Sequence, residues 1–155
     1  MDPLPAFFLV SILVVFPLAW LGGGHTERAG VALYLCLYIL GRLTQHIQIG
    51  NPLLAPALID LTFLIGVVWL ALKRERWWPL VASALQVMVM LVYVGAMLVP
   101  GFSTRSGIVA IMVLGVLGLY CLLGGVLERI LAGETPASAS AVWRRRRPPP
   151  RQPKP

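Results

Sequence analysis

The sequence has little charge for its length. Only 12% of its 155 residues are Asp, Glu, Lys or Arg, and 58% are hydrophobic. Soluble domains carry about 25% charged residues, and a chain this small cannot bury so large an apolar fraction in one core. The composition therefore excludes an ordinary soluble domain and predicts an all-α integral membrane protein.

Cysteine is scarce, and the short patterns that mark common enzymes are missing. Cys36 and Cys121 both lie in apolar runs, without a CxxC pair or a Cys/His cluster, so neither a disulfide framework nor a metal site is expected. The chain also lacks GxSxG, HExxH, Walker and GxGxxG patterns. We therefore expect a protein that is not an enzyme and that uses no cofactor or metal.

Five apolar segments of about twenty residues follow one another, and this is the helix length that crosses a bilayer core. Asp2-Pro3 and Asn51-Pro52 are typical helix starts. If the first segment lies flat on the membrane, four spans remain. Otherwise residues 1–131 form an antiparallel bundle of five transmembrane helices, with spans at about 4–22, 29–49, 53–72, 78–99 and 107–127.

Lys and Arg are unevenly distributed between the two ends of this bundle. Placing the 73–76 loop in the cytoplasm puts eleven of the thirteen on that side, and leaves only Arg42 and Arg105 elsewhere. Cytoplasmic loops carry an excess of Lys and Arg. The sequence therefore predicts a multi-pass protein of the plasma (inner) membrane, with its N-terminus outside and its C-terminus in the cytoplasm.

The composition changes abruptly at position 132, where the last apolar segment has ended. Residues 132–155, the C-terminal tail, are rich in Arg and Pro and are predicted to be disordered. Basic residues beside a membrane attract anionic lipid head groups, whereas one Trp offers no stacking platform for nucleic acid. The expected partners are therefore lipids, and the residues assigned to them are Trp143, Arg144, Arg145, Arg146, Arg147, Arg151 and Lys154.

Two opposite charges fall inside the apolar segments. Arg42 precedes Asn51 by nine residues and Asp60 follows it by nine, which places both about 13 Å from the intervening turn. Charges at that depth are costly and normally find partners. Two interpretations stay open: a buried ion pair that fixes helix register, or a proton or cation site at Asp60 that Arg42 modulates. The polar residues expected nearby are Gln45 and His46, with Gln86 on the fourth segment, where Ser83, Met90 and Tyr93 share its face.

The fifth segment carries a face of small residues. Small residues let helix backbones approach closely, so this face is predicted to pack against another helix, in the bundle or in a partner. Its members are Gly107, Gly115, Gly118 and Gly125.

Four short motifs lie between Leu58 and Gln86, and this stretch covers about a fifth of the chain. They are Leu58-Ile59-Asp60-Leu61, Leu70-Ala71-Leu72-Lys73-Arg74, Arg76-Trp77-Trp78-Pro79-Leu80 and Ala84-Leu85-Gln86. With these motifs the chain resembles a family of uncharacterised small multi-pass inner-membrane proteins of alphaproteobacteria. The resemblance implies an inner-membrane protein of this size and no particular activity.

Three functional hypotheses follow from these features. The first is a non-enzymatic accessory, scaffold or assembly component of a membrane complex, which binds other subunits or a second copy of itself. The second is a small proton- or ion-coupled transporter or channel that uses Asp60 and Arg42. The third, a redox or quinone-linked subunit, depends on His46 alone, because His25 lies about 31 Å from it along the second helix.

Overall fold

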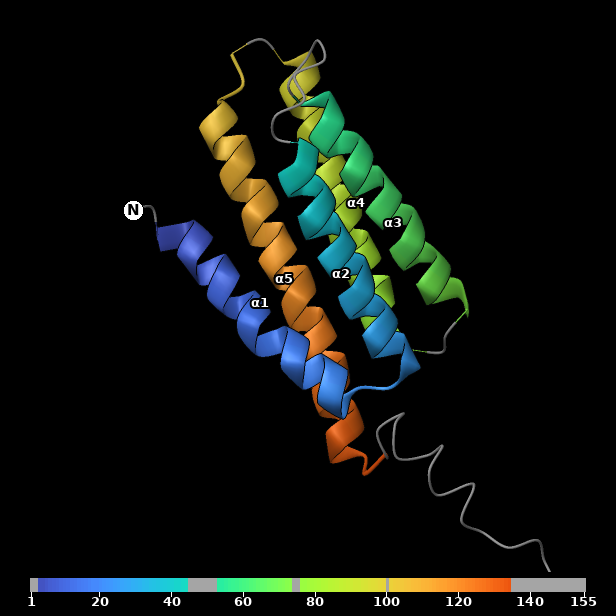
Figure 1. The fold of residues 1–155 in the computed structure, drawn as a ribbon. Helices are drawn as coiled ribbons and strands as arrows, with labels where there is room; N and C mark the ends of the chain where they lie inside the picture. The colour runs from blue at the N-terminus through green and yellow to red at the C-terminus, as the bar shows by residue number, and fades with distance from the viewer. Residues whose placement is uncertain (1–2, 45–52, 74–75, 100, 135–155) are drawn as a thin grey trace, which may run out of the picture.

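The computed structural model describes residues 3–44, 53–73, 76–99 and 101–134, and this part of the chain is all-helical. The predicted all-α class is confirmed (Figure 1). The five helices among the described residues are α1 (Pro3–Gly22), α2 (His25–Thr44), α3 (Leu54–Lys73), α4 (Trp77–Leu98) and α5 (Thr104–Leu131).

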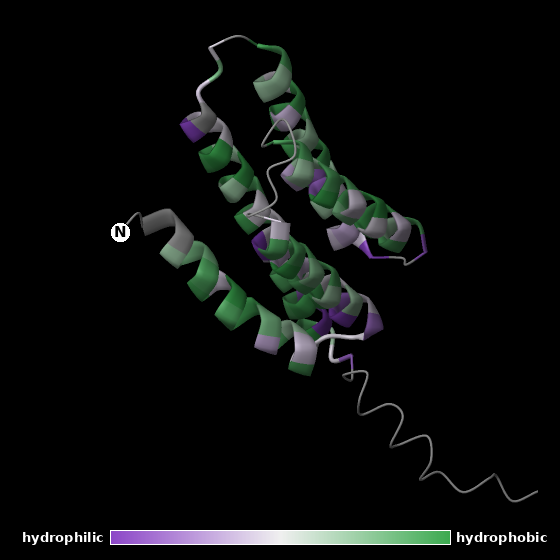
Figure 2. Cartoon of the chain, turned by 45° about the horizontal axis from the view of Figure 1, so that its top comes forward, coloured by the Kyte–Doolittle hydropathy of each residue, from purple (hydrophilic) through white to green (hydrophobic). Residues whose placement is uncertain are grey.

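Three of these helices are long and apolar enough to cross a membrane: Leu54–Lys73, Trp77–Leu98 and Arg105–Leu131. The apolar part of α1, Ala6–Gly22, is shorter. Helix α2 begins with four polar residues, His25 to Arg28. Figure 2 shows that hydrophobic residues predominate along the helices.

Helices α2 and α5 begin earlier than the apolar pattern predicts. At the start of α2 the Glu27 carboxylate accepts a hydrogen bond of 2.7 Å from the Gly24 N–H, which satisfies one of the free donors of the first turn. At the start of α5 the Ser103 hydroxyl accepts from the Ser106 N–H at 3.4 Å. Polar caps therefore extend both helices beyond their apolar segments.

The helices close into a ring of neighbours. Helix α5 packs along α4 and α1, α3 packs between α4 and α2, and α2 also contacts α1 and α5. Figure 1 shows that the α1–α2 connection and the end of α5 lie at the same end of the bundle. We call this the tail end, because the C-terminal tail follows α5 there, and we call the other end the far end.

The hydrophobic core occupies the tail-end half of the bundle. The buried cluster takes residues from the second halves of α1 and α5, from the middle and second half of α3, and from the first halves of α2 and α4. Its members are Val15, Ala19, Val31, Tyr34, Phe63, Val67, Leu70, Trp78, Ala82, Leu119, Leu122 and Val126. The N-terminal end of α1 stands apart from the other helices (Figures 1 and 2).

Trp78 is the central side chain of this core and is fully buried. A Cβ built at Gly30 would lie 2.5 Å from the Trp78 Cη2 atom, and a Cβ at Gly125 would lie 2.9 Å from its Cγ atom. The two glycines therefore make room for opposite edges of the indole. Because neither position has space for a side chain, the ring fixes how closely α2 and α5 approach α4.

Candidate functional site

The one acidic side chain described within the apolar part of the bundle, Asp60, is bound by two residues of α4. The Tyr93 hydroxyl donates to Asp60 Oδ2 at 2.8 Å, and Gln86 Nε2 donates to Asp60 Oδ1 at 3.1 Å. The Gln86 amide also lies 3.3 Å from the Asp60 carbonyl oxygen. We call Asp60, Gln86 and Tyr93 the intramembrane cluster.

The sequence of each helix explains why these three residues meet. On α3, Asp60 lies one turn before the buried Phe63 and Val67, so it continues the stripe that faces the bundle interior. On α4, Gln86 and Tyr93 belong to the stripe of buried residues that also contains Val89. Since these stripes face each other, the carboxylate finds its donors across the α3–α4 contact.

The predicted Arg42–Asp60 ion pair is not among the salt bridges of the described residues. Both oxygens of Asp60 accept hydrogen bonds from α4, and Arg42 is not among the partners of Asp60 in the described part of the chain. The side chain of Arg42 is exposed. Equal offsets from Asn51 place the two residues at the same depth, but they do not determine the direction in which each side chain points from its helix axis. The side chain of Asp60 points toward α4.

Two further predicted members of the site, Gln45 and His46, lie outside the described residues, as does the predicted disordered tail beyond Glu134. Within residues 3–44, 53–73, 76–99 and 101–134, no three His, Cys, Asp or Glu side chains gather as metal ligands. The structure thus brings together Asp60, Gln86 and Tyr93. Tyr93 was expected to share the face of Gln86 but was not assigned to the site.

The small face of α5 packs inside the bundle. A Cβ at Gly118 would clash with the Tyr34 hydroxyl of α2, and Gly125 faces Trp78 of α4. At Gly115 the nearest heavy atom to a Cβ belongs to Phe8 of α1, at 3.8 Å. Gly118 and Gly125 thus pack against other helices of the bundle, whereas Gly107 meets Phe102, which precedes α5.

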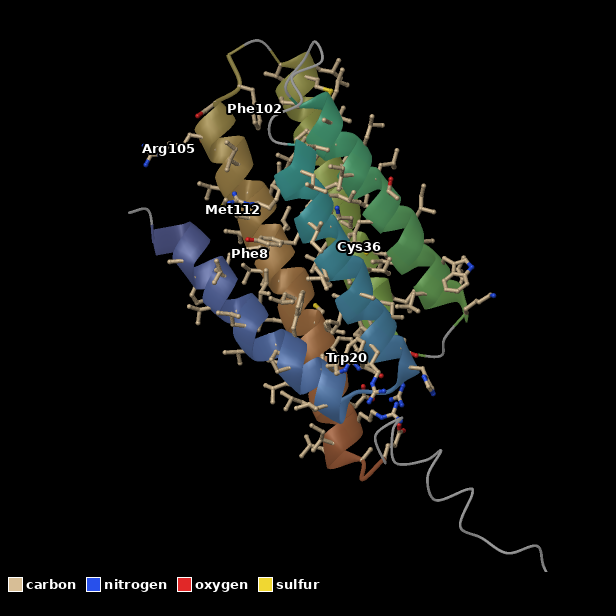
Figure 3. The ribbon with its side chains drawn as sticks, in the orientation of Figure 1. Phe8, Trp20, Cys36, Phe102, Arg105 and Met112 are labelled. Atoms are coloured by element: carbon tan, nitrogen blue, oxygen red, sulfur yellow. The ribbon has the colours of Figure 1, made fainter. Side chains whose placement is uncertain are left out.

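A second polar group lies at the tail end and was not anticipated. Glu27 is 0% exposed, and its Oε2 atom lies 3.7 Å from Arg129 Nη1. Arg129 also lies 3.5 Å from Glu134, and Glu134 pairs in turn with Arg76. Figure 3 shows nitrogen and oxygen atoms gathered here, beside Trp20.

This end cluster of Glu27, Arg76, Arg129 and Glu134 ties the last turn of α5 to α2 and to the start of α4. The neighbouring Glu128 accepts a hydrogen bond from the Trp77 indole N–H. The signal for the cluster in the sequence is the three-residue spacing of Gly24 and Glu27, which is that of a helix cap. Such spacing indicates a cap but does not reveal the cation that α5 brings to it.

Lys and Arg side chains at this end also contact Trp residues. The Arg28 guanidinium lies 5.7 Å from the centre of the Trp20 ring, and Lys73 Nζ lies 4.6 Å from that of Trp69. Tryptophan with Lys or Arg is typical of a membrane–water interface. The tail end therefore has the composition of an interfacial layer.

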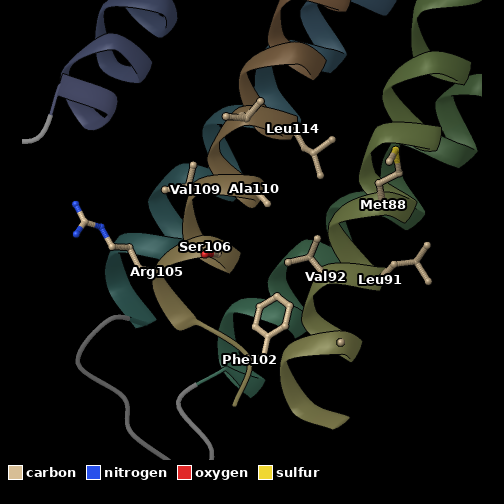
Figure 4. Close-up of a pocket in the computed structure, with 11 residues that line it drawn as sticks. Met88, Leu91, Val92, Phe102, Arg105, Ser106, Val109, Ala110 and Leu114 are labelled. Carbon is tan, nitrogen blue, oxygen red and sulfur yellow. The ribbon is translucent and has the colours of Figure 1, made fainter. Parts of the chain in front are cut away.

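The far half of the bundle contains an open groove between α4 and α5, with a volume of about 900 Å³. Its walls are apolar except near the start of α5, where Arg105 and Ser106 lie (Figure 4). On α4, the two residues of the intramembrane cluster, Gln86 and Tyr93, face α3. The groove lies on the opposite side of α4. The two features are therefore separate.

Comparison with known proteins gives no relative from which a role could be transferred. No protein family, curated protein or solved structure matches this chain.

Proposed function

We propose that the protein is a non-enzymatic accessory component of a membrane complex, with the bundle as its anchor and the basic tail as its docking arm. In this proposal it spans the plasma (inner) membrane five times, with its N-terminus outside and its C-terminus in the cytoplasm. Each of the five helices has at least 20 residues, or about 30 Å of rise, which matches the thickness of a bilayer core.

The observation that carries the proposal is the distribution of acidic residues at the tail end. Glu27, Glu128 and Glu134 are all bound to side chains of the bundle itself. After Glu134 the chain contains no Asp or Glu but six Lys or Arg residues. The sequence of the tail thus carries positive charge without an acidic residue of its own, which favours binding to an acidic protein surface or to anionic lipid.

Crosslinking in native membranes tests this role. We expect the full chain to migrate in a species larger than itself, and replacement of residues 144–147 by Gln to reduce that species, because the docking charge is lost. Replacement of residues 148–150 by Ala is the matched control, since it keeps the length and the charge of the tail. If all three chains migrate alone after crosslinking, the protein is not a component of a complex.

Labelling of single cysteines tests the orientation. In a background with Cys36→Ala and Cys121→Ala, a membrane-impermeant reagent added to intact cells should label Ser103→Cys, which lies at the far end. The same reagent should label Gly133→Cys only after the cells are opened. The reverse pattern would contradict the orientation.

The intramembrane cluster favours a second candidate, a proton or cation site at Asp60. Tyr93 and Gln86 are neutral donors, and an anionic carboxylate at that depth is costly without a positive charge. Proton uptake by vesicles that contain the protein tests this candidate. Asp60→Asn should abolish an uptake that wild type shows, whereas no uptake by wild type would leave the cluster a structural contact between α3 and α4.

A further inference from the structure

The proposed function does not use the groove between α4 and α5. Met88, Leu91, Val92 and Gly95 of α4 form one wall, and the first three turns of α5 form the other (Figure 4). Its volume of about 900 Å³ lies in the range of small-molecule pockets. The groove opens to the side, so its occupant enters from the plane of the membrane.

Phe102 and small residues keep the two walls apart at the far end. The Phe102 ring lies between the helices in Figure 4, 2.9 Å from the position of a Cβ at Gly107 and 4.0 Å from one at Gly95. On the α5 wall beside the ring, the side chains of Ser106 and Ala110 are too short to fill the space between the two helices. The ring therefore acts as a spacer, and the groove persists below it.

The length of the groove corresponds to one leaflet. From Arg105 to Leu114 the α5 wall rises about 14 Å. Half of a bilayer core is about 15 Å thick. A single extended hydrocarbon chain of this length is thinner than a helix, whose diameter with side chains is about 10 Å, and it can therefore lie between α4 and α5.

The polar end of the groove lies where a lipid head group would lie. The aliphatic stem of Arg105 lines the groove, and Figure 4 shows its guanidinium extending outward, away from α4. Arg105 is exposed, and among the described residues it has neither a hydrogen bond nor an ion pair. An apolar groove of leaflet length with an uncommitted cation at its interfacial end is complementary to an anionic amphiphile.

We propose that this groove binds one acyl chain of a phospholipid of the far leaflet, and that Arg105 binds the phosphodiester of its head group. Surrounding lipids are as apolar as the groove, so the hydrocarbon chain alone gives little preference for this site. The charge of Arg105 supplies the preference, and an anionic head group is favoured over a zwitterionic one.

A photoreactive phosphatidylglycerol with a diazirine in its acyl chain tests the proposal in phosphatidylcholine vesicles that contain the full chain. After irradiation we expect the label to concentrate on residues 88–95 and 105–114. Gly95→Leu should remove most of this label, because a Cβ there meets only Phe102, at 4.0 Å, and the longer side chain would occupy the groove. Gly41→Leu on α2 is the matched control, since a Cβ there has no neighbour within 4 Å, and it should leave the label unchanged.

Charge variants test the head-group contact. Arg105→Gln should lower labelling by the phosphatidylglycerol probe about fivefold and labelling by a phosphatidylcholine probe less. Lys73→Gln, at the opposite end, should change neither. Equal labelling of all exposed helix faces, or no response to Gly95→Leu or to Arg105→Gln, would overturn the proposal. Efficient crosslinking of Gly95→Cys between two copies would do so too, because a second chain would then occupy the groove.

Discussion

Adding one methyl group at Gly125 should destabilise the bundle, because the space that the methyl group needs is filled by Trp78. A Cβ at Gly125 would lie 2.9 Å from Trp78 Cγ and closer still to Cδ1, whereas ordinary van der Waals contact begins near 3.4 Å. The indole cannot move away, since its other edge is held at Gly30 and the side chain is fully buried.

The magnitude follows from two opposing contributions. Overpacking of a filled core costs about 1–3 kcal/mol. Alanine is favoured over glycine in a helix by about 0.5–1 kcal/mol at most. We therefore expect Gly125→Ala to lower the free energy of unfolding by about 1 kcal/mol, within a range of about 0–2.5 kcal/mol, and the Tm by about 2–4 °C for a chain of this size.

Thermal unfolding of the purified protein in one detergent measures this loss. Gly41→Ala is the matched control and should lose no stability, since a Cβ at that position has no neighbour within 4 Å. Trp78→Phe combined with Gly125→Ala should cost less than the sum of the two single changes, because the smaller ring relieves the clash. Equal stability of Gly125→Ala and Gly41→Ala would refute the close approach of α4 and α5.

Three other predictions concern the polar groups. Tyr93→Phe should lower the free energy of unfolding by about 0.6–1.7 kcal/mol, because an Asp60 oxygen loses its donor; unchanged thermal unfolding would mean that this bond contributes nothing. Arg129→Met should cost about 3–5 kcal/mol by leaving the buried Glu27 without a cation, and adding Glu27→Gln should recover much of that loss in the same assay. A peptide of residues 132–155 should sediment with anionic vesicles and dissociate as salt rises, since screening shortens the field to about 8 Å at physiological ionic strength; binding that ignores salt would contradict this.

The positions of the helices were predictable because long apolar runs separated by Gly, Pro and charged residues leave few alternatives. The hydrogen-bond partners of Asp60 could not be predicted in the same way. Its depth follows from counting residues, but its direction depends on which side of α3 faces α4, and the buried stripe of Phe63 and Val67 decides that. Of the residues that the sequence proposed for this site, the structure places Gln86 beside Asp60, and the second donor is Tyr93.

The same distinction applies to the packing of the helices. A face of glycines on α5 indicates close packing, yet only the assembled helices show that Tyr34 and Trp78 fill it. Likewise the pairing of Glu27 with Arg129 joins residues about a hundred positions apart, and no local pattern connects them. Contacts between distant segments are set by the whole fold, so they escape reasoning from spacing.

The neighbours of α1 have a consequence for biosynthesis. Helix α1 packs more extensively on α5 than on α2, although α5 is the last of these helices to leave the ribosome. The first helix therefore lacks its most extensive partner until nearly the whole chain has been made. Chains that stop before α5 would leave the α5-facing sides of both α1 and α4 uncovered, so the packing of the first helix depends on completion of the last one.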